Sequence, residues 1–124
     1  MLGRVYASGH IVCRASQKEA EEYYEYNAVE MADHESVDTL FRIRLEGGTH
    51  SLREAIHDRR RLASGLGTFP IVGDPEFVAA KLSEFSDAGL NGMAFGLVNY
   101  VDELPLIAAE LLPRMERLGI RQAS

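Results

Sequence analysis

The hydrophobic positions of this chain form two strand-then-helix patterns, separated by a middle without a regular period. Residues 4–13 are rich in β-branched and small residues, which predicts a strand that ends near Arg14. Ser16 and Glu19 then have the spacing of a capping box, in which a serine hydroxyl accepts from the first free N–H groups of a helix. Beyond this start, apolar residues recur at helical spacing and predict a helix with one buried face: Ala20, Tyr23, Tyr24, Ala28 and Met31.

The second pattern begins with a clear helix start at residues 74–76, where Asp74 can act as N-cap and Pro75 suits the first turn. We expect this helix to bury Val78, Leu82 and Phe85 and to end at Gly89. The continuous apolar run 93–98 then predicts a buried strand of the parallel kind. Gly96 inside that run suggests the close approach of another backbone or of a ligand.

A last helix follows the second strand, and Asp102 is the residue that can cap it. Its wide apolar stripe runs from Leu104 to Leu118, and Pro113 within the stripe predicts a kink or a break. Gly119 is expected to end the helix. Alternation of strand and helix predicts an α/β domain with parallel strands.

The middle of the chain, residues 34–67, is expected to be an irregular insertion. Residues 35–50 have no clear period, and Gly47 and Gly48 interrupt them. Ser51 and Glu54 form a second capping box, which predicts a short basic helix to about Leu62. Residues 64–68 then have the composition of a flexible loop.

Length and charge limit what the chain can be. With 124 residues it has the length of one domain, 1–124, and is too short for a complete (β/α)₈ barrel of about 250 residues. A net charge of −6 disfavours nucleic acid and anionic membranes as partners. A single cysteine, Cys13, and the lack of an apolar stretch of membrane-spanning length fit a cytoplasmic protein.

Few residues indicate chemistry by spacing alone. His10 is either a hydrogen-bonded core histidine or a site residue, and with Cys13 it makes no metal pair because the two point to opposite faces of a strand. Residues 19–38 contain eight acids and no base, which indicates a solvated helix face or, alternatively, a cation-binding face. Residues 33–35 are best interpreted as a solvated helix end. Arg59–Arg61 suit either a solvated helix end or contact with a phosphate or sulfonate.

Several motifs, in order, resemble a known family. The segment 70–82, PIVGDPEFVAAKL, is followed by AGLNG at 88–92, the apolar strand, YVDEL at 100–104 and LLP at 111–113. This order resembles the C-terminal end of the bacterial-luciferase-like flavin monooxygenases, which include alkanesulfonate and dimethylsulfone monooxygenases. Their helix start is of the type VGTPEEVAEKL, and they usually carry a proline at the position of Pro113. Residues 8–16 are similar to the strand before the penultimate barrel helix of that family.

The resemblance implies a TIM (β/α)₈ barrel, of which this chain would cover about the last two strand–helix units. It implies reduced FMN supplied by a flavin reductase, with O₂ and a small organic substrate that is oxygenated. Two alternatives stay open: a deazaflavin-dependent oxidoreductase of the same superfamily, and a non-catalytic α/β fragment that acts through self-association or a partner subunit. Because a barrel cut in this way exposes two strand edges and an apolar interior, we expect a homo-oligomer or a partner chain.

The resemblance also implies site residues. His10 matches a histidine that contacts substrate or flavin in the sulfonate monooxygenases. Residues 34–67 resemble the mobile insertion of that family, and Arg61 within this insertion would contact an anion. Gly67 and Tyr100 would line the mouth of the site. Two departures argue against a sulfonate substrate: Ser8 replaces the family's arginine, and Val98 replaces its tyrosine. No metal is implied. Since barrel chemistry takes place at C-terminal strand ends, we expect the first strand to end closer to His10 than its composition suggests.

Overall fold

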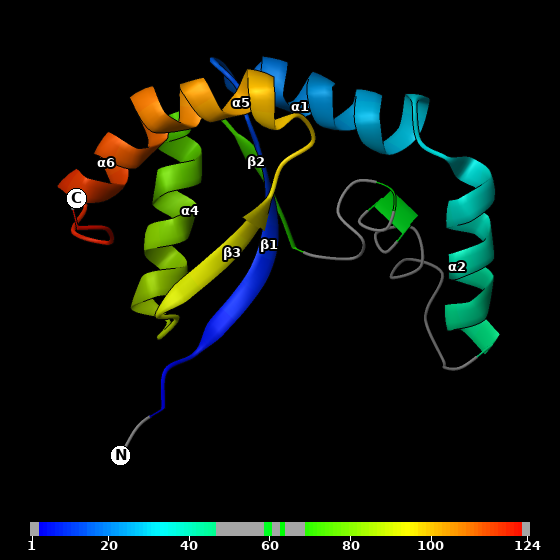
Figure 1. Ribbon diagram of the computed structural model, residues 1–124, viewed down its shortest axis with the longest axis horizontal. Helices are drawn as coiled ribbons and strands as arrows, with labels where there is room; N and C mark the ends of the chain where they lie inside the picture. The colour runs from blue at the N-terminus through cyan, green and yellow to red at the C-terminus, as the bar shows by residue number, and fades with distance from the viewer. Residues whose placement is uncertain (1–2, 47–58, 61–62, 64–68, 123–124) are drawn as a thin grey trace.

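The computed structural model describes residues 3–46, 59–60, 63 and 69–122. Three strands, β1 (Tyr6–Cys13), β2 (Phe69–Gly73) and β3 (Gly92–Gly96), form one parallel sheet in the order β2-β1-β3 (Figure 1). Helices flank this sheet, so the chain has an α/β fold, and the part that the structure describes forms no closed barrel.

The helices fall into three groups along the chain. The first follows β1, the second connects β2 to β3, and the third follows β3 as one long helix that a π-helical turn interrupts (Figure 1). In chain order they are α1 (Gln17–Glu25), the π-helical turn η1 (Tyr26–Glu30), α2 (His34–Glu46), α4 (Pro75–Asp87), α5 (Tyr100–Leu106), the π-helical turn η2 (Ile107–Leu111) and α6 (Leu112–Arg117).

The central strand β1 pairs with its two neighbours over different halves of its length. β3 lies beside the first half, from Tyr6 to His10, and its last residue, Gly96, pairs with His10. β2 lies beside the second half, from Gly9 to Cys13. The sheet is therefore staggered, and β3 ends three residues before β1 does. Because side chains alternate along a strand, Ile11 and Cys13 occupy one face of the sheet and Ser8 and His10 the other.

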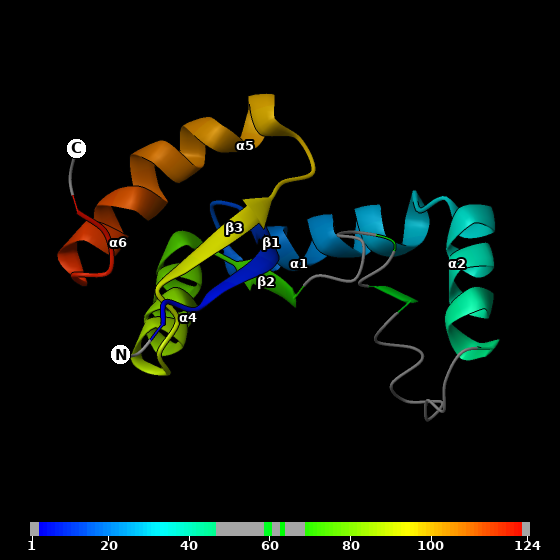
Figure 2. The ribbon, with the colours of Figure 1, turned by 60° about the horizontal axis from the view of Figure 1, so that its bottom comes forward.

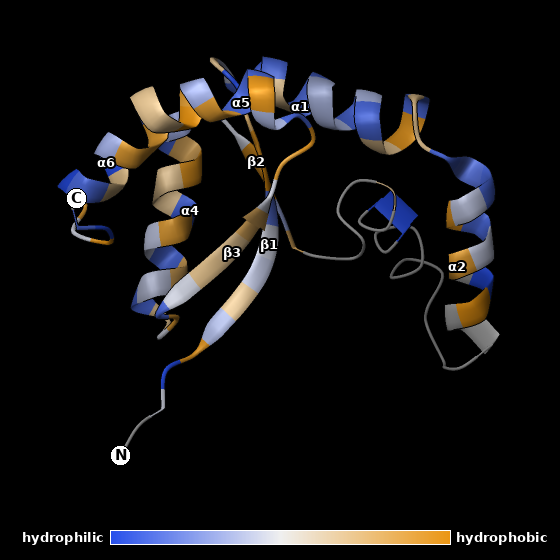
Figure 3. Ribbon diagram, viewed as in Figure 1, coloured by the Kyte–Doolittle hydropathy of each residue, from blue (hydrophilic) through white to orange (hydrophobic). Residues whose placement is uncertain are grey.

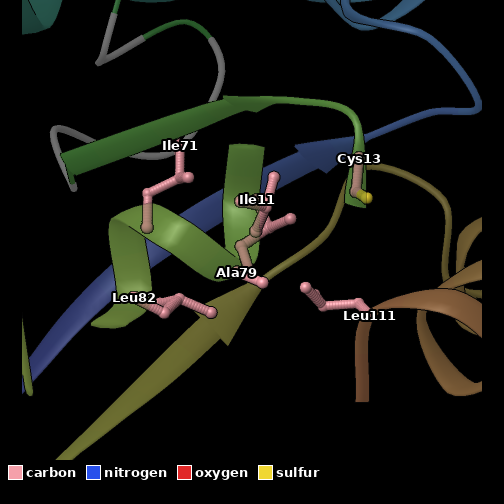
Figure 4. Close-up of a cluster of buried hydrophobic side chains, with 7 residues drawn as sticks. Ile11, Cys13, Ile71, Ala79, Leu82 and Leu111 are labelled. Carbon is pink, nitrogen blue, oxygen red and sulfur yellow. The ribbon is translucent and has the colours of Figure 1, made fainter. Parts of the chain in front are cut away.

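One face of the sheet carries the hydrophobic core. Ile11 and Cys13 of β1 and Ile71 of β2 are buried against α4 and η2, as Figure 4 shows. The helices contribute Val78, Ala79, Leu82 and Leu111 to this cluster. We call this side of the sheet the covered face.

The opposite side, which we call the open face, is covered over only half its length. Tyr6, Ser8 and Ala94, near the strand beginnings, are exposed. His10 and Val12, further along β1, are buried, and the ring of Tyr24 on α1 stacks on His10. The open face therefore changes from exposed to enclosed as β1 approaches its C-terminal end.

The predicted helix boundaries are largely confirmed. Ser16 Oγ accepts from Glu19 N at 3.1 Å at the start of α1, and Asp74 Oδ1 accepts from Phe77 N at 2.8 Å at the start of α4. Gly89 and Gly119 both have positive φ just beyond helix ends, a conformation that glycine adopts without strain.

The C-terminal helix differs from its prediction in one respect. Asn99, not Asp102, is the N-cap: its Oδ1 accepts from the backbone N–H groups of Val101 and Asp102. The expected irregularity at Pro113 is confirmed, because the π-helical turn η2 ends directly before α6 and Pro113 lies in the first turn of α6. A proline has no N–H to donate to the preceding turn, so the regular ladder is broken there.

Two predictions about exposure and regularity are wrong. The strand expected to be buried over 93–98 ends at Gly96 and is only half-buried, because it lies at the sheet edge with helices on one side. Residues 34–46 are not irregular but form α2, where Asp33 Oδ1 accepts from Ser36 N at 3.1 Å. Figure 2 shows α2 standing apart from the sheet. The predicted helix from Ser51 and the loop 64–68 lie outside the described residues, apart from residues 59–60 of that helix, which are helical.

Candidate functional site

His10 lies on the open face where β3 ends. Its side chain is 3% exposed, and its ring stacks on Tyr24 with 6.2 Å between centroids and 22° between planes. β1 does not end earlier than expected, since it continues to Cys13. Because Gly96 pairs with His10 and is the last residue of β3, His10 is nevertheless level with a C-terminal strand end. Because the strands are staggered, His10 in the middle of β1 lies beside the last residue of β3.

Gly96 keeps space free beside this histidine. A Cβ built at Gly96 meets only His10 Cβ, at 3.9 Å, which is ordinary contact. No backbone of the described residues approaches Gly96 closely enough to require a glycine. The expected close approach of another backbone is therefore not found, and the other reason given for Gly96, a ligand, stays a prediction.

The β3–α5 connection is fixed by polar contacts at the same end of the sheet. Glu103, which is 0% exposed, accepts from Asn99 N through Oε2, and its Oε1 has no partner among the described residues. Tyr100 is half-exposed, and its hydroxyl accepts weakly from Leu97 N at 3.4 Å. Glu103 therefore holds the start of α5 in place, while Tyr100 stands at the surface beside it.

Cys13, on the covered face, is unsuited to nucleophilic chemistry. The pKa of its thiol is raised from 9.0 to about 11, first by burial and then by the negative charges of Asp74 and Glu103. The nearby Arg114 and Arg14 lower it by less. Because the thiolate is the nucleophile, a buried thiol with this pKa is almost entirely unreactive at neutral pH.

Arg14 and Asn27 place polar groups around Tyr23 of α1. The guanidinium of Arg14 lies over the Tyr23 ring, 3.9 Å from its centroid, and Asn27 Nδ2 donates to Tyr23 O at 2.8 Å. Arg14 Nε and Asn27 Oδ1 are buried without a partner among the described residues. This side of α1 meets the end of β3 at a surface depression, and the residues that line it are Tyr23, Tyr26, Asn27, Met31, Ala63, Leu97 and Val98.

The predicted basic cluster is partly described. Arg59 pairs with Asp38 of α2, and Arg60 pairs with Glu25 of α1 at 3.3 Å. These two arginines therefore form partly exposed ion pairs with acidic side chains of this chain, which agrees with a solvated helix end, and the contact with a phosphate or sulfonate stays a prediction. Asp33 caps α2, which confirms residues 33–35 as a helix end, and the hydrogen bond from Ser36 N lowers the pKa of Asp33 below its ordinary 3.8.

The structure thus places two of the four predicted site residues. His10 and Tyr100 both lie at the C-terminal end of β3, one enclosed on the open face and one at the surface. Arg61 and Gly67 lie outside the described residues. Sequence reasoning missed Glu103 and Arg14. The only available signal for Glu103 was its position four residues after Asn99, which places both at the start of one helix turn.

Among the described residues, no group of three or more histidine, cysteine or acidic side chains is arranged to hold a metal ion. None of the helices described has both the length and the apolar composition needed to cross a bilayer.

The chain was also compared with known proteins. No protein-family model matches it, and no curated protein matches it. The resemblance to luciferase-like monooxygenases therefore stays a prediction, supported by the motifs themselves.

Proposed function

We propose that this chain forms the C-terminal part of a luciferase-like, flavin-dependent monooxygenase that uses reduced FMN and O₂ to oxygenate a small organic substrate. One observation carries the proposal. The core helices α4 and η2 pack on one face of a parallel sheet, while the first half of the opposite face exposes Tyr6, Ser8 and Ala94 and its second half is enclosed beside Tyr24 of α1. In a barrel, helices cover the outside and the other face points inward, so the exposed half of this face is what a segment of a barrel would show.

The position of His10 supports the same proposal. It lies on the face that would point into the barrel, and it is level with the C-terminal end of β3, where barrel enzymes place their chemistry. An imidazole there can donate or accept a hydrogen bond, or hold a proton, next to a bound substrate. Tyr24 covers the ring and limits the access of water to it.

The open face beside His10 fits a planar ring. Ser8, Ala94 and Gly96 are small, and a Cβ at Gly96 would meet only His10 Cβ at ordinary contact distance. A flat isoalloxazine could therefore lie against the sheet at this point. When bound, reduced flavin supplies the electrons that activate O₂, while the protein shapes and dries the site.

The other implied roles follow from the resemblance alone. Arg61, which belongs to the insertion, would contact an anionic group of the ligand. Gly67 and Tyr100 would line the mouth of the site. Contacts to the flavin phosphate would come mainly from barrel units that precede this chain. Ser8 and Val98, which replace a family arginine and tyrosine, favour a substrate other than a sulfonate.

A titration of the purified chain with oxidised and then reduced FMN, followed by flavin fluorescence, tests the proposal. We expect saturable binding in the micromolar range, where ligands gain roughly 8 kcal/mol. Gly96→Val places a branched side chain in the space beside His10, and we expect it to weaken binding at least tenfold. Gly3→Val is the matched control, because nothing lies within 4 Å of a Cβ at Gly3.

The same titration separates the alternatives. Absence of binding at millimolar FMN would contradict a flavin site in this chain. Saturable binding of a deazaflavin in place of FMN would favour the deazaflavin-dependent oxidoreductase. Equal binding by the wild type and Gly96→Val would place the flavin elsewhere and remove the support that the open face gives.

A non-catalytic fragment that acts through association is the second candidate. The observation that favours it is the amount of hydrophobic surface that the described residues expose, which includes Tyr6 on the open face and Val101 on α5. Defined oligomers without any flavin binding would support this candidate over catalysis.

A further inference from the structure

Arg14 is a partly buried cation for which the described part of the chain supplies no carboxylate. Six other basic side chains there form ion pairs with acids of this chain. Arg4, Arg42 and Arg117 form none, but they are exposed to water. Arg14 is partly buried, and its Nε is buried without a hydrogen-bond partner among the described residues. Because a cation withdrawn from water without a partner is unfavourable, an anion bound at Arg14 would be stabilising.

The guanidinium of Arg14 is held in one place. On the main chain, Arg14 N donates to Gly73 O at 3.2 Å, which continues the pairing of β1 with β2. On the side chain, the guanidinium lies over the ring of Tyr23, 3.9 Å from its centroid, where the cation and the aromatic face attract each other. A group fixed in this way loses little conformational freedom when it binds an anion.

Arg14 also lies at the end of the sheet where ligands bind in related folds. It directly follows Cys13, the last residue of β1, and open parallel α/β sheets bind ligands outside the carboxyl ends of their strands. The ring of His10 stacks on Tyr24, and the guanidinium of Arg14 lies over Tyr23. His10 and Arg14 therefore both contact α1, from the same strand.

Tyr23 connects this cation to a surface depression. The depression has a volume of about 510 Å³, within the range of small-molecule sites, and lies between α1, η1 and the end of β3. Met31, Leu97 and Val98 give it apolar walls, and Figure 3 shows hydrophobic colour along the connection from β3 to α5. A ligand that fills the depression therefore has an apolar part beside the ring on which Arg14 lies.

The surrounding charges favour a ligand with a single negative charge. Asp74 and Glu103 both act electrostatically on Cys13, the residue before Arg14, and the chain as a whole carries a net charge of −6. These charges repel a phosphate, which carries up to two negative charges, more strongly than a carboxylate. The planar guanidinium also fits a carboxylate through two parallel hydrogen bonds.

We infer that Arg14 binds the carboxylate of a small organic acid, whose apolar part lies in the depression beside Tyr23. The binding site does not depend on flavin. That this organic acid is the substrate class of the enzyme rests on the proposed function.

An NMR titration of the full chain with hexanoate tests the inference, because the Nε–H resonance of Arg14 reports binding at this residue. We expect saturable binding with a Kd of about 1 mM, as for a small, weakly bound ligand. Hexanamide has the same length without the charge, and inorganic phosphate has the charge without the apolar part. Both should bind at least tenfold more weakly.

Two variants locate the binding. Arg14→Gln removes the cation and should weaken hexanoate binding at least tenfold. Arg117→Gln is the matched control, since Arg117 is exposed, forms no ion pair with a described residue and lies outside the depression. Met31→Glu introduces a negative charge at a side chain that is 65% exposed, so circular dichroism should show an unchanged fold while hexanoate binding weakens.

Four results would overturn the inference: no saturable binding at tens of millimolar hexanoate, equal binding of hexanamide, tighter binding of phosphate, or equal hexanoate binding by Arg14→Gln. The test uses no flavin, so its outcome is separate from that of the FMN titration. Hexanoate binding in a chain that binds no FMN would leave the carboxylate site in place and remove only its assignment to a monooxygenase substrate.

Discussion

The two faces of the sheet use alternate residues of the same strand for opposite purposes. On the covered face, Ile11 and Cys13 are buried against α4 and η2, and little space is left. On the open face, Ser8 is exposed and His10 is buried, with Tyr24 stacked on its ring. The difference shows that the main hydrophobic cluster lies on one side of the sheet, while the other side is exposed over its first half.

The largest expected difference between the faces is in stability. Ile11→Ala should lower the free energy of unfolding by roughly 2–5 kcal/mol, because it removes buried methyl groups and leaves a cavity. Ser8→Ala should change it by less than about 0.5 kcal/mol, as for most exposed positions. Urea unfolding of both variants measures the difference. Equal effects would mean that the open face is also packed.

A smaller effect concerns the titration of Cys13 on the covered face. Its pKa is about 11 in the folded chain, against 9.0 ordinarily, so the unfolded chain loses this proton first as pH rises. The contribution of the thiol to stability is therefore complete below pH 9 and is lost between pH 9 and 11, by about 1 kcal/mol for each unit of pKa difference.

Urea unfolding at pH 8 and pH 10, on the wild type and on Cys13→Ala, measures this contribution. Other groups titrate in the same range, and the comparison between the two proteins removes them. A wild type whose pH dependence equals that of Cys13→Ala would show that the thiol is not perturbed by burial.

Glycine substitutions should differ in sign between the faces, and the smallest effect should come from the open face. Gly9→Ala places a Cβ 3.1 Å from Met93 Sδ and 3.2 Å from Phe69 O, so we expect a loss of about 1–3 kcal/mol from overpacking. Gly96→Ala meets only His10 Cβ at 3.9 Å and should be neutral or stabilise by up to about 1 kcal/mol. Thermal unfolding of the two variants is the measurement, and destabilisation by Gly96→Ala would show that the space beside His10 is filled.

Local signals predicted much of the fold. The strand ending at Cys13, the helix starts at Ser16 and Asp74, and the helix ends at Gly89 and Gly119 all follow from patterns within a few residues of each other. β2 was missed because its five residues include a proline and a glycine, and β1, with which it pairs, lies more than fifty residues earlier. No local period encodes a pairing at that distance.

The candidate site was less predictable for the same reason. Alternation along β1 places His10 opposite the core, but only the stagger between β1 and β3 makes it level with a strand end. The enclosure of Glu103 depends on how α5 packs over the sheet, which its neighbours in sequence do not reveal. Exposure of β3 likewise follows from its position at the edge, which an apolar run alone cannot indicate.

The strand order has a consequence for how the chain is made. Of the three strands described, β1 is central in space yet comes first in sequence, and both of its neighbours come from the second half of the chain. During translation β1 precedes both of these neighbours, so it pairs with neither until β2 emerges, and its core face has no α4 to cover it. The sheet therefore assembles late and through contacts distant in sequence, which slow folding. Until then, the apolar segment around Ile11, which is buried in the folded chain, is exposed and prone to aggregation.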